Sequence, residues 1–122
     1  MLFRSDHKIY CLEAATGRVL WDYFTEGPVR MAPTVAQGRL YAGSDDGLVY
    51  CLEAATGKSL WRHRVGPRPD RLPGNEQMIS RWPIRSGIVV RENLAYCAAG
   101  LFPEGEGVYL CALDAEIGRA HV

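Results

Sequence analysis

A twelve-residue segment that occurs twice constrains this chain more than any other feature. Tyr10-Cys-Leu-Glu-Ala-Ala-Thr-Gly-Arg-Val-Leu-Trp21 recurs as Tyr50-Cys-Leu-Glu-Ala-Ala-Thr-Gly-Lys-Ser-Leu-Trp61, with ten of the twelve positions identical at an offset of 40 residues. A third copy begins at Ala112-Leu-Asp-Ala115 and then departs from the pattern. A period near 40 residues occurs in helical solenoids and in propeller blades of four strands. Local patterning has to decide between these two architectures.

The segments between the copies favour strands. Short β-branched and aromatic runs, such as residues 39–43 and 48–52, are separated by turn sequences such as 44–47 (Ser-Asp-Asp-Gly). This alternation of short strand-like runs and turn sequences is typical of all-β proteins. No window carries an apolar stripe at helical spacing that is long enough for a helix. We therefore predict an all-β fold, a β-propeller built of four-stranded antiparallel blades.

Each conserved type of residue within the repeat has a physical role in that fold. The glycines can adopt the positive φ of a tight turn, the threonines can hydrogen-bond the turn backbone, and the glutamates can accept from nearby N–H groups. The tryptophans supply large planar side chains suited to the seam between blades. The repeat positions that we assign to this structural motif are Glu13, Thr16, Gly17, Trp21, Glu53, Thr56, Gly57, Trp61 and Asp114.

The repeat resembles the tryptophan-docking motif of the propellers related to pyrroloquinoline-quinone (PQQ) dehydrogenases, Ala-x-Asp-x-x-Thr-Gly-x-x-x-Trp. Here Cys replaces Ala and Glu replaces Asp in the first two copies, whereas Ala112 and Asp114 match the family pattern. WD40 repeats are the near alternative because Trp21-Asp22 is a Trp-Asp pair. That alternative fails, since the second copy reads Trp61-Arg62 and no Gly-His precedes either copy.

The resemblance implies a ring of seven or eight blades, which at about 40 residues each exceeds this chain. We predict a partial propeller over residues 1–115, of about two and a half blades: a half blade at 1–14, a full blade at about 15–53 and a third at about 58–114. Residues 116–122 are similar to one reading frame of a common sequencing adapter, so we interpret them as an adapter-derived tail. A genuine short C-terminus is the alternative.

The third repeat is longer than the others. The step from Leu52 to its counterpart Leu113 is 61 residues, and the extra residues fall mostly in 66–83 and partly in 100–107. Both connections are expected at the same end of the propeller, where binding loops often gather. Residues 62–85 carry six arginines against Asp70 and Glu76. The candidate ligand-binding residues are Arg68, Arg71, Asn75, Arg81, Trp82 and Arg85.

These side chains suit a flat, anionic ligand, because guanidinium groups bind carboxylates and an indole can stack. PQQ is a flat tricarboxylate, so it fits by chemistry. The alternative is an arginine-rich loop that is solvated or paired with Glu104 and Glu106. The family resemblance implies an Asp base and calcium held by Glu, Asn and Asp, but no residue here matches those positions. We assign no catalytic and no metal-binding residue, and PQQ and calcium are implied only by the resemblance.

The four cysteines form no CxxC and no zinc spacing, so we interpret them as small buried side chains. If Tyr41 pairs with Tyr50, then Cys97 faces away from Cys111, and no disulfide is expected between them. His7 and His63 are isolated. The formal net charge is zero and no apolar run is long enough for a membrane helix, so neither nucleic acid nor a membrane span is indicated.

Three functions follow as hypotheses. The first is a non-catalytic scaffold or protein-interaction propeller, similar to outer membrane protein assembly factors. The second is part of a PQQ- and calcium-dependent alcohol or sugar dehydrogenase, and the third is a ligand-sensing propeller fused to another domain. The expected partners are further blades and either a protein or a small ligand. The resemblance implies a periplasmic or other extracytoplasmic location.

Overall fold

Short strands joined by tight turns build the whole of the described structure. The computed structural model describes residues 7–66, 71–74, 77–80, 82–100 and 108–119, with only the backbone described for 71–74 and 77–80. Within these ranges the chain contains strands and turns and no helix, so it has no helix of the length and apolarity that a membrane crossing requires. The predicted all-β fold of four-stranded antiparallel propeller blades is confirmed.

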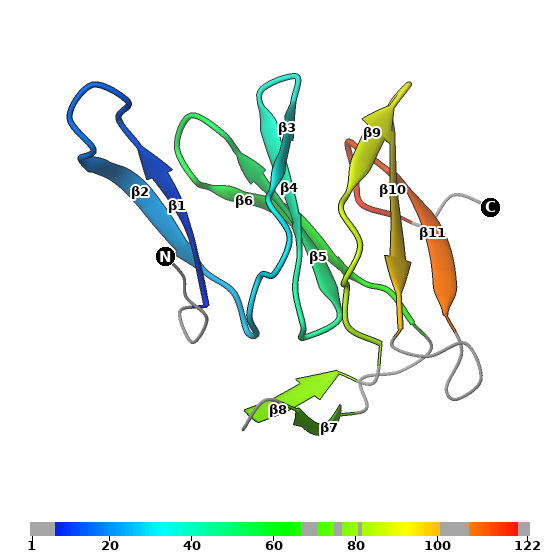
Figure 1. Ribbon diagram of the computed structural model, residues 1–122. Helices are drawn as coiled ribbons and strands as arrows, with labels where there is room; N and C mark the ends of the chain where they lie inside the picture. Colours follow the sequence, from blue (N-terminus) through cyan, green and yellow to red (C-terminus); the bar gives the residue numbers. More distant parts are fainter. Residues whose placement is uncertain (1–6, 67–70, 75–76, 81, 101–107, 120–122) are drawn as a thin grey trace.

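The strands form three antiparallel sheets that lie face to face, with a small hairpin at one end (Figure 1). The first sheet pairs β1 (Lys8–Leu12) with β2 (Val19–Phe24). The second contains β3 (Thr34–Ala36), β4 (Arg39–Gly43), β5 (Leu48–Glu53) and β6 (Ser59–Arg64) in sequence order. The third contains β9 (Val89–Arg91), β10 (Leu94–Ala99) and β11 (Tyr109–Asp114).

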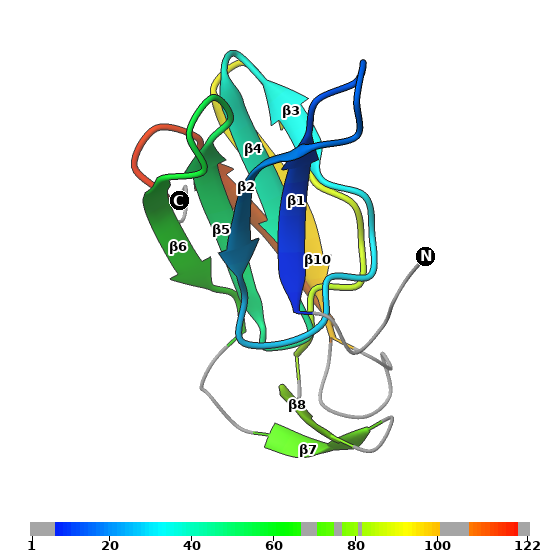
Figure 2. The same cartoon turned by 90° about the vertical axis from the view of Figure 1, so that its left-hand side faces the viewer.

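The hairpin of β7 (Arg71–Gly74) and β8 (Gln77–Ser80) lies at the lower end in both ribbon views. Figure 2 looks along the stack and shows β1 and β2 in front of β4 and β5, with β10 behind them. Strand β10 ends and β11 begins at this same lower end. The two enlarged connections therefore leave the sheets at one end, as the alternation of antiparallel strands requires.

The four-stranded sheet and the predicted full blade cover different residues. The four strands that pair with one another span residues 34–64, whereas the predicted full blade covers about 15–53. The reason is that the repeat turn forms a hairpin between two strands of the same sheet. It joins β1 to β2 in the first sheet and β5 to β6 in the second. Each tryptophan-bearing strand is therefore the outermost strand of its own blade and docks sideways onto the next blade.

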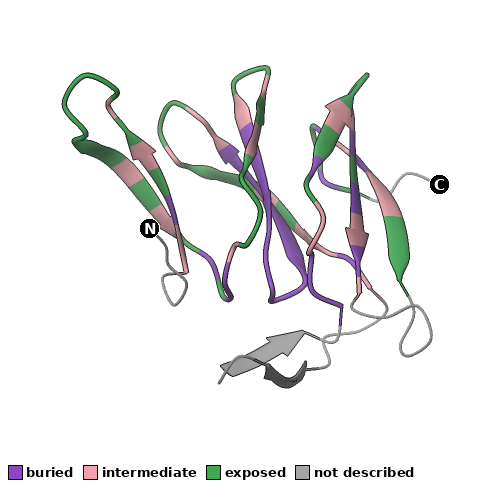
Figure 3. Ribbon diagram, in the orientation of Figure 1, coloured by how far each residue is buried: buried purple, intermediate pink, exposed green. Residues whose placement is uncertain are grey.

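Two apolar clusters fill the seams between the sheets. Ile9, Leu40, Ala42 and Leu52 are buried between the first and second sheets, with Trp21 and Tyr23 packed against them. A larger cluster between the second and third sheets includes Val49, Trp82, Ile84, Ala95 and Leu113. Strand β5 lies between the two seams, so five of its six residues are buried on both faces (Figure 3).

The repeat turn has the same backbone geometry in all three copies. In each copy the acidic residue's carbonyl accepts a hydrogen bond from the glycine N–H at 2.7–2.8 Å, and its own N–H donates to the residue after the glycine at 2.8 Å. The glycine φ angles are +76°, +78° and +72° for Gly17, Gly57 and Gly118. The third copy thus continues through Arg119, although the sequence suggested that it breaks off after Ala115. The adapter origin of residues 116–122 stays a prediction.

The side chains of the turn differ between copies. Thr16 and Thr56 each accept a hydrogen bond from a backbone N–H at 3.2 Å, as predicted. Each of these hydroxyls also donates to the motif glutamate, Glu13 or Glu53, at 2.6 Å, so that the carboxylate accepts from a hydroxyl and not from an N–H. In the third copy Ile117 has no hydroxyl. There the shorter Asp114 accepts directly from the N–H groups of Glu116 and Ile117, at 2.9 and 3.3 Å.

The register of the strands corrects one expectation about the cysteines. Tyr41 pairs with Cys51 and Ala42 pairs with Tyr50, one position away from the assumed pairing. By the same register Cys97 lies directly opposite Cys111 in the third sheet. Side chains of directly paired residues point to the same face. The prediction that Cys97 and Cys111 face away from each other was therefore wrong.

Candidate functional site

The β4–β5 turn of the second sheet, residues 44–47, is the most polar buried region of the described chain. Ser44 and Asp45 have no exposed surface and Asp46 is 5% exposed. Connections on either side clamp this turn: Asp45 N donates to the Pro28 carbonyl and Ile84 N donates to the Ser44 carbonyl, both at 2.9 Å. The turn is therefore buried because the inter-blade connections cover it.

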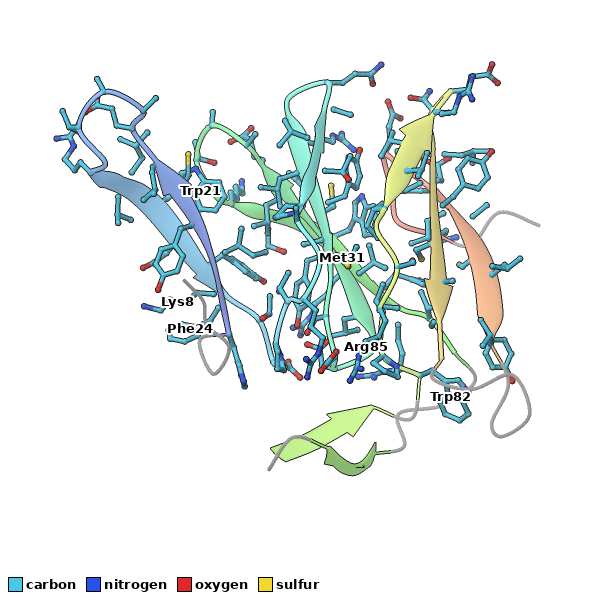
Figure 4. All side chains as sticks on the ribbon, viewed as in Figure 1. Lys8, Trp21, Phe24, Met31, Trp82 and Arg85 are labelled. Carbon is cyan, nitrogen blue, oxygen red and sulfur yellow. The ribbon has the colours of Figure 1, made fainter. Side chains whose placement is uncertain are left out.

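Two arginines from those connections meet on Asp45. Arg30 Nε donates to Oδ2 at 2.7 Å, and Arg85 donates through Nε to Oδ1 at 3.0 Å and through a terminal nitrogen to Oδ2 at 3.2 Å. Both arginine side chains are about one-third exposed. A buried carboxylate needs such partners, because an unpaired buried charge is very costly. Figure 4 shows Arg85 at the lower end of the stack.

Asp46 is held by neutral donors. The Tyr50 hydroxyl donates to Oδ2 at 2.5 Å, and the N–H groups of Glu26 and Leu48 donate to its carboxylate at 3.0 and 2.8 Å. Burial first, and then the hydrogen bond to Asp46, raise the pKa of Tyr50 well above its usual value of 10.0. Tyr50 therefore stays a neutral donor at any physiological pH. Beside this group, Arg64 donates to the Asp46 carbonyl at 2.8 Å.

The outer side of this region carries one further charge pair. Arg62 and Glu26 lie 3.2 Å apart, and both side chains are about half exposed. Four arginines thus surround three carboxylates, which we call the Asp45 cluster: Glu26, Arg30, Asp45, Asp46, Arg62, Arg64 and Arg85. An open groove of about 350 Å³ adjoins it, lined by residues 8–10 and 29–33. This end of the described structure can bind anionic groups through the half-exposed guanidinium of Arg62.

The cluster does not fit calcium or PQQ. Both oxygens of Asp45 are occupied by arginines and Asp46 is satisfied by a phenol and backbone N–H groups, so neither offers oxygens to a calcium ion. Across the described residues no three His, Cys, Asp or Glu side chains converge as metal ligands. Trp82 is 2% exposed and contacts Tyr109 edge-on, with ring centroids 6.1 Å apart. Its ring is thus packed in the core and presents no face to a planar cofactor.

Of the two candidate ligand-binding residues whose side chains the structure describes, Arg85 belongs to the cluster. Trp82 lies in the same connection between β8 and β9 as Arg85, but its side chain is part of the apolar core. Arg71 lies in β7, where only the backbone is described, and Arg68, Asn75 and Arg81 lie outside the described residues. A ligand-binding role for these residues stays a prediction. Sequence inspection missed Arg30, Asp45, Asp46 and Tyr50; the Ser-Asp-Asp-Gly sequence was recognised only as a turn.

The tryptophan motifs form the second well-defined site, and it is structural. Trp21 Nε1 donates to the Ala54 carbonyl and Trp61 Nε1 donates to the Ala115 carbonyl, both at 3.0 Å. Each ring covers the motif glycine of the next blade: a Cβ added at Gly57 would lie 2.5 Å from the Trp21 ring, and one at Gly118 would collide with Trp61 in the same way. Each tryptophan therefore fastens its blade to the turn of the following blade.

A known protein family matches most of this chain. The family model described as outer membrane protein assembly factor BamB matches residues 3–82, which include both complete docking motifs and the Asp45 turn. The chain belongs to this family of PQQ-like β-propellers. A comparison with curated protein sequences gave no match.

Solved structures of the same fold include two dehydrogenases and a BamB protein. A europium-containing methanol dehydrogenase superposes with a TM-score of 0.74 at 17% identity, covering 93% of this chain and 20% of that one. A quinohemoprotein alcohol dehydrogenase from Pseudomonas putida gives 0.73 at 25% identity, with 93% and 17% covered. BamB from Moraxella catarrhalis gives 0.64 at 23% identity, with 96% and 30% covered. The chain therefore spans less than a third of the length of each of these proteins.

Proposed function

We propose that this chain is a segment of a non-catalytic propeller that serves as a protein-binding scaffold in an extracytoplasmic compartment. The match of residues 3–82 to the assembly-factor family is the observation that supports this function. The docking tryptophans bond each blade to the next, and the Asp45 cluster presents arginines at the end where the enlarged connections gather. By analogy with the family's description, the partner is a protein concerned with outer membrane protein assembly.

The partner's acidic side chains would bind the outer face of the Asp45 cluster. Arg62 is the best-placed donor, because it is about half exposed and its present partner, Glu26, is equally exposed. Exposed ion pairs of this kind contribute only about 0–1 kcal/mol, so exchange of Glu26 for a partner's carboxylate costs little. Arg30 and Arg85 would remain hydrogen-bonded to Asp45 and would keep the buried turn in place beneath the binding surface.

Binding to an outer membrane β-barrel protein, unfolded in urea and then diluted, tests the scaffold function. We expect saturable binding, measured by fluorescence anisotropy of the labelled barrel protein, that weakens severalfold in Arg62→Ala. The matched control is Arg18→Ala, since Arg18 is an exposed arginine of a docking turn, away from the cluster. No binding, or equal loss in both variants, would argue against the proposed surface.

The similarity to the quinohemoprotein alcohol dehydrogenase, at 25% identity, supports a second candidate, a segment of a PQQ-dependent dehydrogenase. Titration of the chain with PQQ and calcium separates the two. The scaffold hypothesis predicts neither quenching of tryptophan fluorescence nor dye reduction with an alcohol or sugar, whereas saturable quenching would favour the dehydrogenase. The fused-sensor hypothesis has no supporting observation in the described residues.

A further inference from the structure

Two cysteines meet in the seam between the second and third sheets. Cys97 on β10 is 7% exposed and belongs to the apolar cluster of that seam, and Cys111 on β11 is half-buried against the same cluster. They are directly paired in the strand register, so both side chains point to one face. The two thiols are close enough that each affects the pKa of the other. Both are free thiols.

The strand geometry brings the two sulfurs within reach of a bond. Ala115 N donates to the Asn93 carbonyl at 2.8 Å, and hydrogen-bonded pairs recur at every second position of an antiparallel ladder. Cys97 and Cys111 are therefore a hydrogen-bonded pair, whose Cα atoms lie about 5.5 Å apart. Disulfides span Cα separations of about 4.4–6.8 Å, so the backbone does not have to move far to close one.

Cys11 and Cys51 do not lie opposite another cysteine in their sheets. Cys11 is paired with Trp21 in the first sheet and Cys51 with Trp61 in the second. At the position of Cys111 the second sheet carries Tyr50, and at that of Cys97 it carries Ala42. The paired thiols thus occur only in the third sheet, among the three sheets that the structure describes.

We propose that Cys97 and Cys111 form a reversible cross-strand disulfide, a modification site that ties β10 to β11 at the inter-blade seam. A disulfide across a hydrogen-bonded pair has to draw its Cβ atoms closer than the flat ladder holds them, which strains the bond. Strained disulfides have higher reduction potentials and are the labile ones. The bond therefore opens and closes with the surrounding thiol–disulfide balance. This inference rests on the strand register and is independent of the proposed function.

The oxidant is a disulfide, RSSR, such as oxidised glutathione. The Cys111 thiolate attacks one sulfur of RSSR, forming a mixed disulfide and releasing one RS⁻. The Cys97 thiolate then attacks the Cys111 sulfur, which forms the Cys97–Cys111 bond and releases the second RS⁻. Two thiols lose two protons and two electrons, and one RSSR becomes two RSH. Cys111 reacts first because it is the more exposed of the two.

The environment of the thiols sets the pH dependence of this reaction. Burial first, and then the neighbouring Cys111, raise the pKa of Cys97 to about 12, and burial also raises the pKa of Cys111. The thiolate is the reactive form. Closure should therefore accelerate between pH 7 and pH 9, by up to about tenfold for each pH unit while both thiols remain mostly protonated.

Disulfide mapping of the whole chain tests the proposal. The chain is equilibrated in mixtures of reduced and oxidised glutathione, quenched in acid, alkylated in denaturant and digested for mass spectrometry. We expect an intramolecular peptide pair joining Cys97 to Cys111, lost in Cys97→Ser and in Cys111→Ser, while Cys11 and Cys51 are recovered alkylated. Dithiothreitol should reverse the bond.

Two controls separate this result from unspecific oxidation. Cys51→Ser leaves the pair intact and should keep the Cys97–Cys111 peptide. Oxidation in concentrated urea should give a mixture of pairings, because the register is then lost. Recovery of Cys97 and Cys111 as alkylated thiols throughout, or the same mixture of pairings with and without urea, would overturn the proposal.

Discussion

Gly17 and Gly57 occupy equivalent positions with φ of +76° and +78°, but only Gly57 lies beneath a tryptophan ring. Alanine at either position carries the strain of a positive φ, about 1–2 kcal/mol. Gly57→Ala must also displace the Trp21 ring, whereas nothing lies within 4 Å of a Cβ added at Gly17. We expect Gly57→Ala to lower the free energy of unfolding in urea by roughly 2 kcal/mol more than Gly17→Ala. Equal losses would contradict the docking role of Trp21.

Asp45 and Glu26 show how burial changes the value of an ion pair. Asp45→Asn leaves Arg30 and Arg85 facing a neutral amide in a turn without solvent, and should cost on the order of 3 kcal/mol in the free energy of unfolding. Glu26→Gln breaks only the half-exposed pair with Arg62 and should cost less than about 1 kcal/mol. Chemical denaturation of both variants measures the difference, and a cost for Asp45→Asn no greater than that for Glu26→Gln would argue against a buried anchor.

At the scale of the element, the third docking turn lacks the hydroxyl that the other two contain. Ile117 is 58% exposed and sits where Thr16 and Thr56 bond the turn. Ile117→Thr should raise the free energy of unfolding by about 0.5–1 kcal/mol, because its hydroxyl can bond Asp114. The reciprocal Thr56→Ile should lower it by a similar amount. A fall in stability for Ile117→Thr in urea unfolding would show that the turns are not equivalent.

Strand β6 carries a titratable group that opposes folding in acid. Burial lowers the pKa of His63 from its usual 6.5, so the unfolded chain binds its proton more readily than the folded one. Stability should therefore fall as the pH drops below about 6.5 and level off below the folded pKa. In His63→Gln this component should disappear from the dependence of the urea midpoint on pH. An unchanged pH profile in the variant would assign the acid sensitivity to other groups.

At the scale of the whole molecule, the outer strands leave apolar side chains in water. Leu110 is 86% exposed on β11 and Phe24 is 67% exposed on β2, beside strand edges that are unpaired in the described structure. Open edges of this kind pair with other chains. We expect concentration-dependent self-association in analytical ultracentrifugation, reduced by Leu110→Lys but not by Ala55→Lys in an exposed turn. A monodisperse monomer at all concentrations would contradict this expectation.

The fold was predictable because its main determinants are local and occur more than once. Positive-φ glycines, hydroxyls one residue before them and strand-length apolar runs are visible in any single repeat, and a second copy removes the ambiguity of the first. The predicted division into blades differs from the sheet boundaries because the repeat turn looks the same in the sequence whether it joins two sheets or lies within one. Only the hydrogen bonds between β5 and β6 show that it is a hairpin.

The candidate site was less accessible to sequence inspection because it depends on residues far apart in the chain. Arg30 and Arg85 both bind Asp45, although they lie 15 and 40 residues from it along the chain. No motif or spacing in the sequence predicts these two ion pairs. The arginine excess in 62–85 does include three members of the Asp45 cluster, Arg62, Arg64 and Arg85. Among its described members, however, Arg64 and Arg85 bind buried turn groups, and Trp82 is core.

The repeat, the strand and turn pattern, and hence the propeller family can be recognised from the amino-acid sequence. These follow from periodicity and from backbone preferences, which act over a few residues. Only the folded chain shows which blade each tryptophan docks on, which arginines neutralise Asp45, and that Cys97 faces Cys111. These depend on strand register, where a shift of one residue moves every side chain to the other face of the sheet.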